Sequence, residues 1–278
     1  MPTLQIDSIT YNYLLEGPPK RPIILLIHAL MSNLHMWDST VLALNKANYQ
    51  TLRFDHIGHN LTPPPPPNDQ SQLYTTETIT RHMHTLVTQA THQSHLKAVI
   101  GCSIGGVLAL RYAMLYPSEV ETAISLCAPG IKSLEKAKAL WTQRIQQFEI
   151  DEGEETDTLC RATVDRWLPG DEPHDEAVRA EALKHVKTCT LDGYKVLAVA
   201  IRGYDYSDQL GRLDGVKCVV VAGGRDGAVD AELLKDVAAR IHAPECARFV
   251  LMDDAGHIPP MHRAEEFEAL VLTALEEA

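Results

Sequence analysis

An α/β fold is predicted for this chain, with a mostly parallel central sheet flanked by helices. Short apolar segments that are typical of buried strands alternate with longer segments that repeat apolar residues at helical spacing. Polar loops follow several of the strands, which is where open α/β sheets place their ligands. Residues 131–210 show amphipathic helical stretches and no clear strand, so we expect a helical cap between two parts of the sheet domain, residues 1–130 and 211–278.

Composition and charge exclude several classes of protein. The 278 residues are 45% hydrophobic and 22% charged, as in an ordinary globular protein. The formal net charge of −12 argues against nucleic acid as a partner, because nucleic acid binding needs a concentrated basic surface. No apolar run approaches the roughly 20 residues of a membrane span, and the first residues lack the basic and apolar regions of a signal peptide. We therefore expect a cytoplasmic protein with no membrane partner, and a homodimer stays open.

The first half of the chain alternates strands and helices up to residue 128. Ile23–Ile27 is a continuous apolar run, as a strand covered on both faces requires, whereas Ser8–Leu15 alternates and suits an edge strand. The five prolines Pro63–Pro67 predict an extended, solvated connector. The other strands are expected at 51–55, 96–100 and 123–128, and the helices at 37–45, 75–92 and 107–116.

The second half begins with the cap and returns to the sheet after residue 214. Ser133–Phe148 and His174–Lys187 read as cap helices, and the acidic run Asp151–Glu155 reads as a loop between them. The remaining strands are expected at 217–222 and 248–252, and the remaining helices at 230–242 and 263–277.

The stretch Gly101-Cys102-Ser103-Ile104-Gly105-Gly106 lies between a predicted strand and a predicted helix. Gly-x-Ser-x-Gly in that context predicts a sharp turn on which the Ser103 hydroxyl stands exposed. The helix that follows directs free N–H groups to the same place, where they would stabilise an anion developing on a substrate carbonyl. A buried serine that only caps the helix is the structural alternative.

Three polar residues, Ser103, Asp226 and His257, each follow a predicted strand. A serine hydroxyl is a poor nucleophile at neutral pH and needs a base, for which histidine has a suitable pKa. The imidazole in turn needs a carboxylate that fixes its tautomer and stabilises its cation. The order serine, acid, histidine is the one associated with this strand–turn–helix nucleophile, so the sequence predicts a catalytic triad.

Each member of this triad has competitors along the chain. Asp230 falls at a helix start, where Asp commonly caps the helix, while Asp253 and Asp254 lie too close in sequence to His257 to reach its far nitrogen easily. His28 and His56 also occupy loops after strands, but both precede the serine. We expect Cys102, one place before the exposed serine, to point into the sheet.

Further candidates surround the triad. By position, the backbone N–H groups of Leu30 and Ile104 would form the oxyanion hole. Trp141 and Trp167 lie in the cap, where packing is the default for Trp and substrate contact is the alternative. Two cap arginines would bind a substrate carboxylate or pair with nearby aspartates, and the alternatives are open: Arg202 with Asp205, and Arg166 with Asp165.

The cysteines and histidines do not predict a metal site. The six cysteines are scattered without a Cys-x-x-Cys pair, which favours free, mostly buried thiols in a reducing compartment. Four histidines lie close together in sequence, but no carboxylate or thiolate joins them at ligand spacing, so we favour a polar helix face: His82, His84, His92 and His95.

Several short motifs together resemble those of α/β-hydrolases along nearly the whole chain. They are Ile27-His28-Ala29-Leu30, Phe54-Asp55-His56-Ile57-Gly58-His59, Gly101-Cys102-Ser103-Ile104-Gly105-Gly106, Gly224-Arg225-Asp226 and Ala255-Gly256-His257. The cap motifs Asp165-Arg166-Trp167, Asp192-Gly193-Tyr194 and Ala200-Ile201-Arg202 most resemble those of the 3-oxoadipate enol-lactonases and related esterases. The resemblance implies an α/β-hydrolase fold with a cap over the active site, opening of a lactone or ester by the serine, and no cofactor.

A serine hydrolase of small carboxylic esters or lactones is therefore the predicted function. The same triad also serves C–C bond cleavage, acyl transfer or cyclisation, which differ in the access of water to the acyl-enzyme. A ligand receptor built on a hydrolase scaffold is a further alternative, because a fold and a triad do not fix a function.

Overall fold

The computed structural model describes residues 2–66, 73–170, 172–241 and 247–277. Its centre is an eight-stranded sheet in the order β1-β2-β4-β3-β5-β6-β7-β8. The β1–β2 and β2–β4 pairs are antiparallel and all other pairs are parallel, so the prediction of a mostly parallel sheet is confirmed. The strands are β1 (Thr3–Ile6), β2 (Ile9–Glu16), β3 (Ile23–Ile27), β4 (Gln50–Phe54), β5 (Leu96–Cys102), β6 (Val120–Leu126), β7 (Lys217–Gly223) and β8 (Ala247–Met252).

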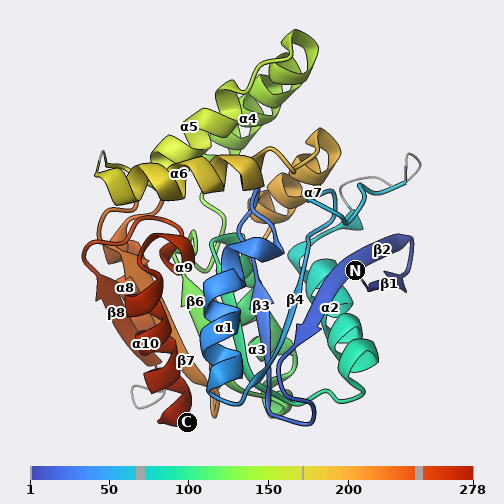
Figure 1. The fold of residues 1–278 in the computed structure, drawn as a ribbon, viewed down its shortest axis with the longest axis vertical. Coiled ribbons are helices and arrows are strands. Elements are labelled where there is room, and N and C mark those ends of the chain that lie inside the picture. The colour runs from blue at the N-terminus through green and yellow to red at the C-terminus, as the bar shows by residue number, and fades with distance from the viewer. Residues whose placement is uncertain (1, 67–72, 171, 242–246, 278) are drawn as a thin grey trace.

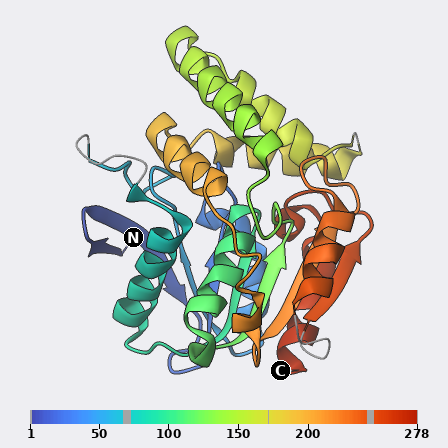
Figure 2. The same ribbon diagram turned by 180° about the vertical axis from the view of Figure 1, so that it is seen from behind.

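Helices cover both faces of the sheet. Helices α1 and α10 lie on one face (Figure 1), and α2, α3 and α8 lie on the other (Figure 2). Helix α3 is mostly apolar and buried from Ile104 to Met114, as a helix between the sheet and further helices requires, and its one charged residue, Arg111, pairs with Glu77. The bounds of these helices are α1 (Asp38–Lys46), α2 (Thr76–Thr91), α3 (Ile104–Leu115), α8 (Ala231–Arg240), α9 (Pro259–His262) and α10 (Ala264–Glu276).

Four helices between β6 and β7 form a cap on one end of this layered body (Figure 1). The cap helices are α4 (Glu135–Glu154), α5 (Thr158–Trp167), α6 (Pro173–Val186) and α7 (Leu191–Arg202). All four fall within residues 131–210, while the domain boundaries at residues 130 and 210 stay predictions. Short 3-10 helices also lie at Leu34–Trp37, Pro117–Glu119 and Leu210–Leu213.

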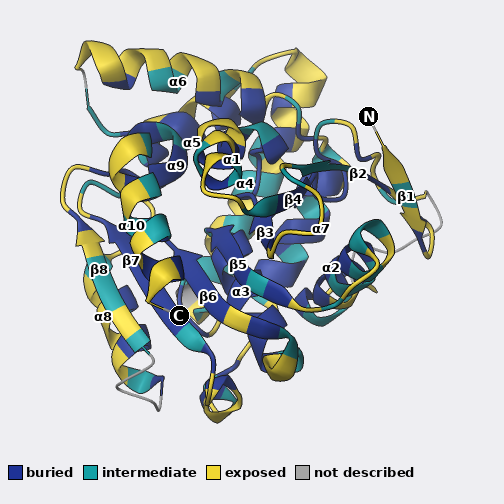
Figure 3. Ribbon diagram, turned by 60° about the horizontal axis from the view of Figure 1, so that its bottom comes forward, coloured by how far each residue is buried: buried dark blue, intermediate teal, exposed yellow. Residues whose placement is uncertain are grey.

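The core is continuous through the central strands. Every residue of β3 is buried, with an exposed fraction of at most 1%. Figure 3 shows the buried strands at the centre and exposed residues on the outer faces of the flanking helices. The apolar run Ile23–Ile27 therefore has the both-sided burial that its sequence predicts.

The N-terminal edge of the sheet differs from the prediction. The strand predicted at 8–15 is β2, but it is not the edge, because β1 pairs with it and is itself the edge strand. A tight hairpin joins the two strands, with Ile6 opposite Ile9 and Asp7 at a φ of 51°. Between β1 and β2 the sequence has no turn signal other than Asp7-Ser8, so the prediction did not include β1.

The acidic run in the cap is also not a loop as predicted. Helix α4 continues through Glu154, and Asp151 is only 4% exposed. Its carboxylate accepts hydrogen bonds from the Thr156 hydroxyl (2.8 Å) and from the Leu159 N–H (2.7 Å) at the start of α5. An acidic side chain in this run thus caps the next helix, and the chain stays helical up to that point.

The proline run, the cysteines and the clustered histidines are described next. The proline run forms neither helix nor strand over 63–66, and Pro67 lies outside the described residues, as do His242 at the predicted helix end and Cys246. The five described cysteines are buried, and no disulfide joins any two of them. Three of the clustered histidines face different carboxylates, His82 with Asp7, His84 with Glu119 and His95 with Glu121.

Candidate active site

Ser103 lies at a sharp turn between β5 and α3. Its φ of 59° and ψ of −120° are strained for a residue with a side chain. A Cβ on Gly101 would lie 1.9 Å from the Gly105 carbonyl oxygen, so the strand and the helix can pass this closely only with glycine there. The local sequence thus forms the turn that the pattern predicts, and Ser103 lines a cavity beneath the cap.

His257 and Asp226 form a buried pair at the ends of β8 and β7. Nδ1 of His257 lies 2.8 Å from Oδ2 of Asp226, and the two side chains are 4% and 1% exposed. The other carboxylate oxygen, Oδ1, accepts hydrogen bonds from the N–H groups of Ala228 (2.7 Å) and Val229 (3.1 Å). These bonds fix the carboxylate, and His257 lines the same cavity as Ser103.

The competing acids occupy other positions. Asp230 accepts a hydrogen bond from the Glu232 N–H (3.0 Å) and caps α8. Asp253 and Asp254 are exposed. Asp226 is the one of these four carboxylates that contacts the His257 ring.

Two thiols lie directly beneath the His257–Asp226 pair. Cys102 Sγ donates to the His257 carbonyl oxygen (3.3 Å), and the Cys127 sulfur lies within 4.8 Å of ring or carboxylate atoms of both His257 and Asp226. Burial raises the pKa of both thiols well above the usual value, and the Asp226 charge adds to this. Both cysteines are therefore neutral thiols, which makes Cys102 a poor nucleophile.

The loop after β3 places Leu30 beside the cavity. The Leu30 N–H donates to no described residue, and Ile104 begins α3, where N–H groups lack acceptors within the helix. The next residue, Met31, is held because its N–H donates to Nε2 of His59 (3.1 Å). His59 Nδ1–H in turn donates to the Ile57 carbonyl oxygen (2.9 Å).

Two further buried histidines support the same loop. The His56 N–H donates to Nε2 of His28 (2.9 Å), and His56 Nε2–H donates to the His28 carbonyl oxygen (3.0 Å). His28 Nδ1–H donates to the Ala29 carbonyl oxygen (2.8 Å). Burial lowers the pKa of His28 well below the usual value and that of His56 to about 3. His28 and His56 thus act as neutral parts of the framework, not as the base.

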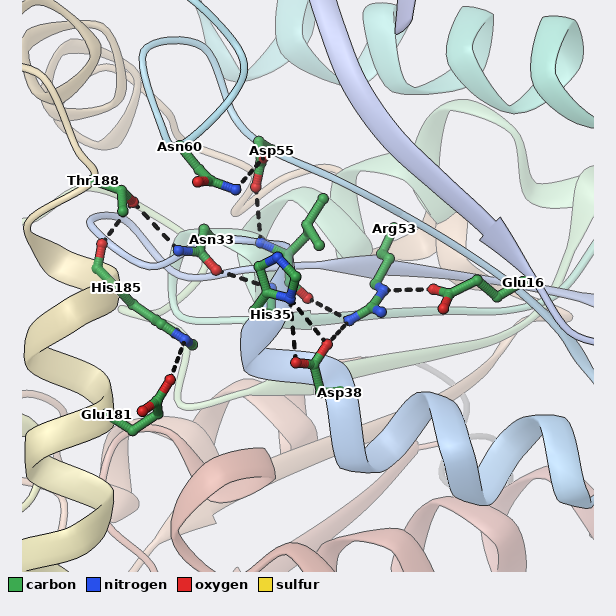
Figure 4. Close-up of polar contacts among 11 residues, drawn as sticks. Glu16, Asn33, His35, Asp38, Arg53, Asp55, Asn60, Glu181, His185 and Thr188 are labelled. Atoms are coloured by element: carbon green, nitrogen blue, oxygen red, sulfur yellow. Dashed lines mark hydrogen bonds and ion pairs between the residues drawn. The ribbon is translucent and has the colours of Figure 1, made fainter. Parts of the chain in front are cut away.

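Asp55, at the end of β4, ties this loop to the rest of the sheet (Figure 4). Its Oδ1 accepts from the Leu34 N–H (2.9 Å), and its Oδ2 accepts from the side-chain amide of Asn60 (3.0 Å). Asn33, in the same loop, donates from its amide to the Thr188 hydroxyl of the cap (3.3 Å). The candidate oxyanion loop is therefore fixed to both the sheet and the cap.

The cavity between sheet and cap has a volume of about 440 Å³. Trp167 lines it and stacks on the His257 ring, with ring centroids 5.8 Å apart and planes inclined by 26°. Trp141 lines it from α4. Both tryptophans thus lie where a substrate would contact them, and Trp167, at 4% exposed, is also packed.

The two cap arginines for which alternatives were open lie in different surroundings. Arg166 lines the cavity, and its neighbour Asp165 pairs with Arg179 instead. Arg202 is not among the residues that line the cavity, although Ile201 on the same helix lines it. Among the described residues, Arg202 forms no ion pair with Asp205.

Two cavity residues were missed as binding candidates. Arg144 lines the cavity one turn after Trp141, and Tyr194 lines it from α7. The spacing of Trp141 and Arg144 placed them on one helix face, but nothing in the sequence of α4 indicated that this face turns to the cavity.

The end of α5 packs directly on the loop that carries His257. The His257 N–H donates to the Trp167 carbonyl oxygen (2.7 Å). A Cβ on Gly256 would lie 2.2 Å from that same oxygen, so glycine is required for this approach. The position of the candidate base therefore depends on the cap as well as on the sheet.

Asp175, on cap helix α6, forms a second link to these loops. It is fully buried, and its Oδ1 accepts from His262 Nε2–H (2.7 Å) and from Arg263 (3.1 Å). Its Oδ2 lies 3.2 Å from Nη2 of Arg225, the residue before Asp226. Because Nδ1 of His262 accepts from the Gly256 N–H (2.7 Å), one cap carboxylate supports both loops.

Asp175→Ala is expected to lower the free energy of unfolding by about 3 kcal/mol, because it leaves the buried His262 donor and the half-buried Arg225 and Arg263 without their partner. Burial would raise the pKa of Asp175, but hydrogen bonds from His262 and Arg263 outweigh it and hold the pKa at about 2. Urea denaturation at neutral pH measures the change. Asp165→Ala is the matched control, since it removes an exposed ion pair on the cap and should cost less than about 1 kcal/mol. Equal losses in the two variants would contradict the role of Asp175.

Comparisons with known proteins place this architecture. No described helix is both long and apolar enough to cross a membrane. No curated protein matches the chain in sequence. The solved enol-lactonase from Burkholderia xenovorans LB400 is 23% identical with a TM-score of 0.85, and the match covers 99% of this chain and 100% of that one.

Two further solved structures have the same fold. A hydrolase from Pseudomonas aeruginosa PA01 is 23% identical with a TM-score of 0.83, over 99% of this chain and 97% of that one. A thermophilic esterase from Thermogutta terrifontis, with malate bound, is 19% identical with a TM-score of 0.84, over 100% and 99%. A family model described as alpha/beta hydrolase fold matches residues 22–264, and the chain therefore belongs to the α/β-hydrolase family.

Proposed function

We propose that this protein hydrolyses carboxylic esters or lactones of small molecules through an acyl-enzyme formed on Ser103. The observation that carries the proposal is the buried His257–Asp226 hydrogen bond in the cavity that Ser103 also lines. An enol-lactonase and an esterase among proteins of the same fold add support.

In the proposed reaction, Ser103 Oγ attacks the carbonyl carbon while His257 Nε2 takes the hydroxyl proton. Asp226 accepts a hydrogen bond from Nδ1–H of His257 and stabilises the imidazolium that forms. The N–H groups of Leu30 and Ile104 donate to the oxygen that becomes negative, an interaction of about 3 kcal/mol in the transition state. His257 then protonates the leaving alkoxide or enolate, and water, activated by the same imidazole, releases the acid.

The position of the Leu30 loop makes this oxyanion site preorganised. Hydrogen bonds to His59 and Asp55 fix the residues on the C-terminal side of Leu30. Fixed donors stabilise charge without the reorganisation that water would need, which is why they lower the barrier. The mechanism requires no cofactor, and the cavity of about 440 Å³ suits a small metabolite.

The test is covalent labelling combined with a substrate panel. We expect a fluorophosphonate to label the intact protein at Ser103, located by mass spectrometry, and Ser103→Ala to lose the label. Short p-nitrophenyl esters and small lactones should be hydrolysed by the intact protein. Ser133 also lines the cavity, so a label on Ser133 would contradict the proposed nucleophile. Labelling of Ser103 without hydrolysis of any ester or lactone would instead favour acyl transfer or C–C bond cleavage.

A further inference from the structure

Two arginines face the cavity, and neither forms an ion pair with a carboxylate of the described residues. Arg144 comes from the middle of α4 and Arg166 from the last turn of α5, and both are half-buried. In the described part of the chain, no Asp or Glu oxygen lies within 4.0 Å of either guanidinium. Buried or half-buried charges normally have partners, so two unbalanced cations in one cavity need an explanation.

The two guanidinium groups are held in place by neutral contacts. Arg166 donates to the Ala162 carbonyl oxygen and to the Thr163 hydroxyl, both at 3.3 Å. The Arg144 guanidinium lies 4.8 Å above the Trp141 ring, a cation–π contact. These contacts orient the cations without neutralising them.

Without a ligand, two half-buried cations in one cavity destabilise the folded protein. Burial, together with the positive charge of Arg144, lowers the pKa of Arg166 to about 10. Burial also lowers the pKa of Arg144. Two like charges that destabilise each other in the folded state are typical of a binding site, where a ligand supplies the opposite charge.

A third donor adjoins the two arginines. Tyr194, from α7, lines the same cavity, and its ring is 1% exposed. Burial raises the pKa of its hydroxyl, which therefore keeps its proton and can donate it in a hydrogen bond. Among the described lining residues the only carboxylate is Asp230, which caps α8 and pairs with neither arginine.

We propose that Arg144, Arg166 and Tyr194 bind an ionised carboxylate of the substrate, so that the preferred substrates are esters or lactones that carry a free carboxylate. Guanidinium groups match the two oxygens of a carboxylate with parallel N–H bonds. A phosphate site would be expected to add N–H groups of a helix N-terminus, whereas Arg144 and Arg166 lie in the middle and at the C-terminal end of their helices.

This inference rests on the proposed function, since it names the substrate class of the same cavity. The remote carboxylate would contact three cap helices while the ester carbonyl lies at Ser103. Thr163 links the two regions, because it accepts from Arg166 and donates to the Met31 sulfur (3.7 Å) next to Leu30. Binding of the anion would therefore position the substrate against the oxyanion loop.

The test compares monomethyl pimelate, which carries one carboxylate, with dimethyl pimelate, its neutral counterpart. Binding is measured by calorimetry on the Ser103→Ala variant, so that it does not depend on turnover, and hydrolysis is measured on the intact protein. We expect the monoanion to bind at least about 10-fold more tightly than the diester. Arg144→Gln and Arg166→Gln should each weaken binding of the monoanion about 10-fold and leave binding of the diester unchanged.

Arg161→Gln is the matched control. Arg161 lies on α5 like Arg166, but it is exposed and pairs with Asp157, so its loss removes the same charge away from the cavity. Binding of the monoanion should be unchanged in this variant. Thermal unfolding verifies that the variants fold, and we expect Arg166→Gln to raise the Tm, because it removes a desolvated cation.

The outcomes separate the two proposals. Equal binding of monoanion and diester, no binding of the monoanion, or a preference that survives the double variant Arg144→Gln/Arg166→Gln would overturn the carboxylate site. If neutral esters are hydrolysed through Ser103 all the same, the proposed reaction stands without that site. If the monoanion is preferred and the intact protein hydrolyses neither ester, the carboxylate site stands and the proposed reaction fails.

Discussion

Asp226→Asn is expected to lower kcat about 10,000-fold for any ester that the protein hydrolyses. The N–H groups of Ala228 and Val229 both donate to Oδ1, so the amide oxygen of Asn must take that position. The amide NH2 group then faces Nδ1 of His257, which has to become a hydrogen-bond acceptor. The ring proton moves to Nε2, and the imidazole can no longer accept the proton of Ser103.

Steady-state kinetics of purified variants measure this effect. Asp254→Asn is the control, because Asp254 is exposed, close to His257 in sequence and a competitor for the role of the acid. We expect its kcat to stay within about twofold of the unmodified protein, as for surface substitutions in general. A loss in Asp254→Asn with little loss in Asp226→Asn would transfer the role of the acid to the other loop.

The three residues of the proposed triad could be selected from the sequence because their signals are local. Ser103 lies in a short pattern whose glycines are required by one turn, and Asp226 and His257 each follow an apolar strand. In a parallel sheet all such strand ends meet at one edge, so residues more than a hundred positions apart are brought together by topology alone. The structure brings His257 and Asp226 into contact at 2.8 Å.

The cap could be predicted only as helical. Which face of α4 turns to the cavity depends on how α4, α5 and α7 pack, and the apolar pattern of α4 does not reveal it. Arg144 is therefore not predicted as a cavity residue, while the candidate Arg202 is not among the residues that line the cavity. The role of Asp175 could not be predicted either, because its partners His262 and Arg263 lie 87 and 88 residues away in the sequence. A buried cluster of that kind has no local signal.

The histidines that support the candidate oxyanion loop also could not be predicted as such. His28 and His56 were considered as rivals for the base, and His59 was noted only within a motif. In the folded protein each of the three is buried and uses ring nitrogens to hold backbone groups. Sequence alone does not distinguish a histidine that titrates from one that replaces a buried amide, because the difference is one of burial.

Acidification below pH 6.5 is expected to destabilise the protein steeply through these three histidines. Burial lowers the pKa of His28 well below the usual value, that of His56 to about 3 and that of His59 to about 4. In the unfolded chain each titrates near 6.5. The unfolded state therefore binds protons first, so the stability is fully present above pH 6.5 and is lost as the pH falls toward 4.

The free energy of unfolding should fall by about 1.4 kcal/mol per pH unit for each of these histidines within that window. Urea denaturation at pH values from about 8 to about 5, in steps of about one unit, measures how the free energy of unfolding changes with pH. His59→Gln should reduce the slope by about one histidine's share, whereas His95→Gln, at an exposed position, should leave it unchanged. Because Nε2 of His59 accepts the Met31 N–H, protonation of this nitrogen would also release the candidate oxyanion loop. A stability that stays constant from pH 7 to 5 would show that the three rings do not remain neutral, and the loop would then need another support.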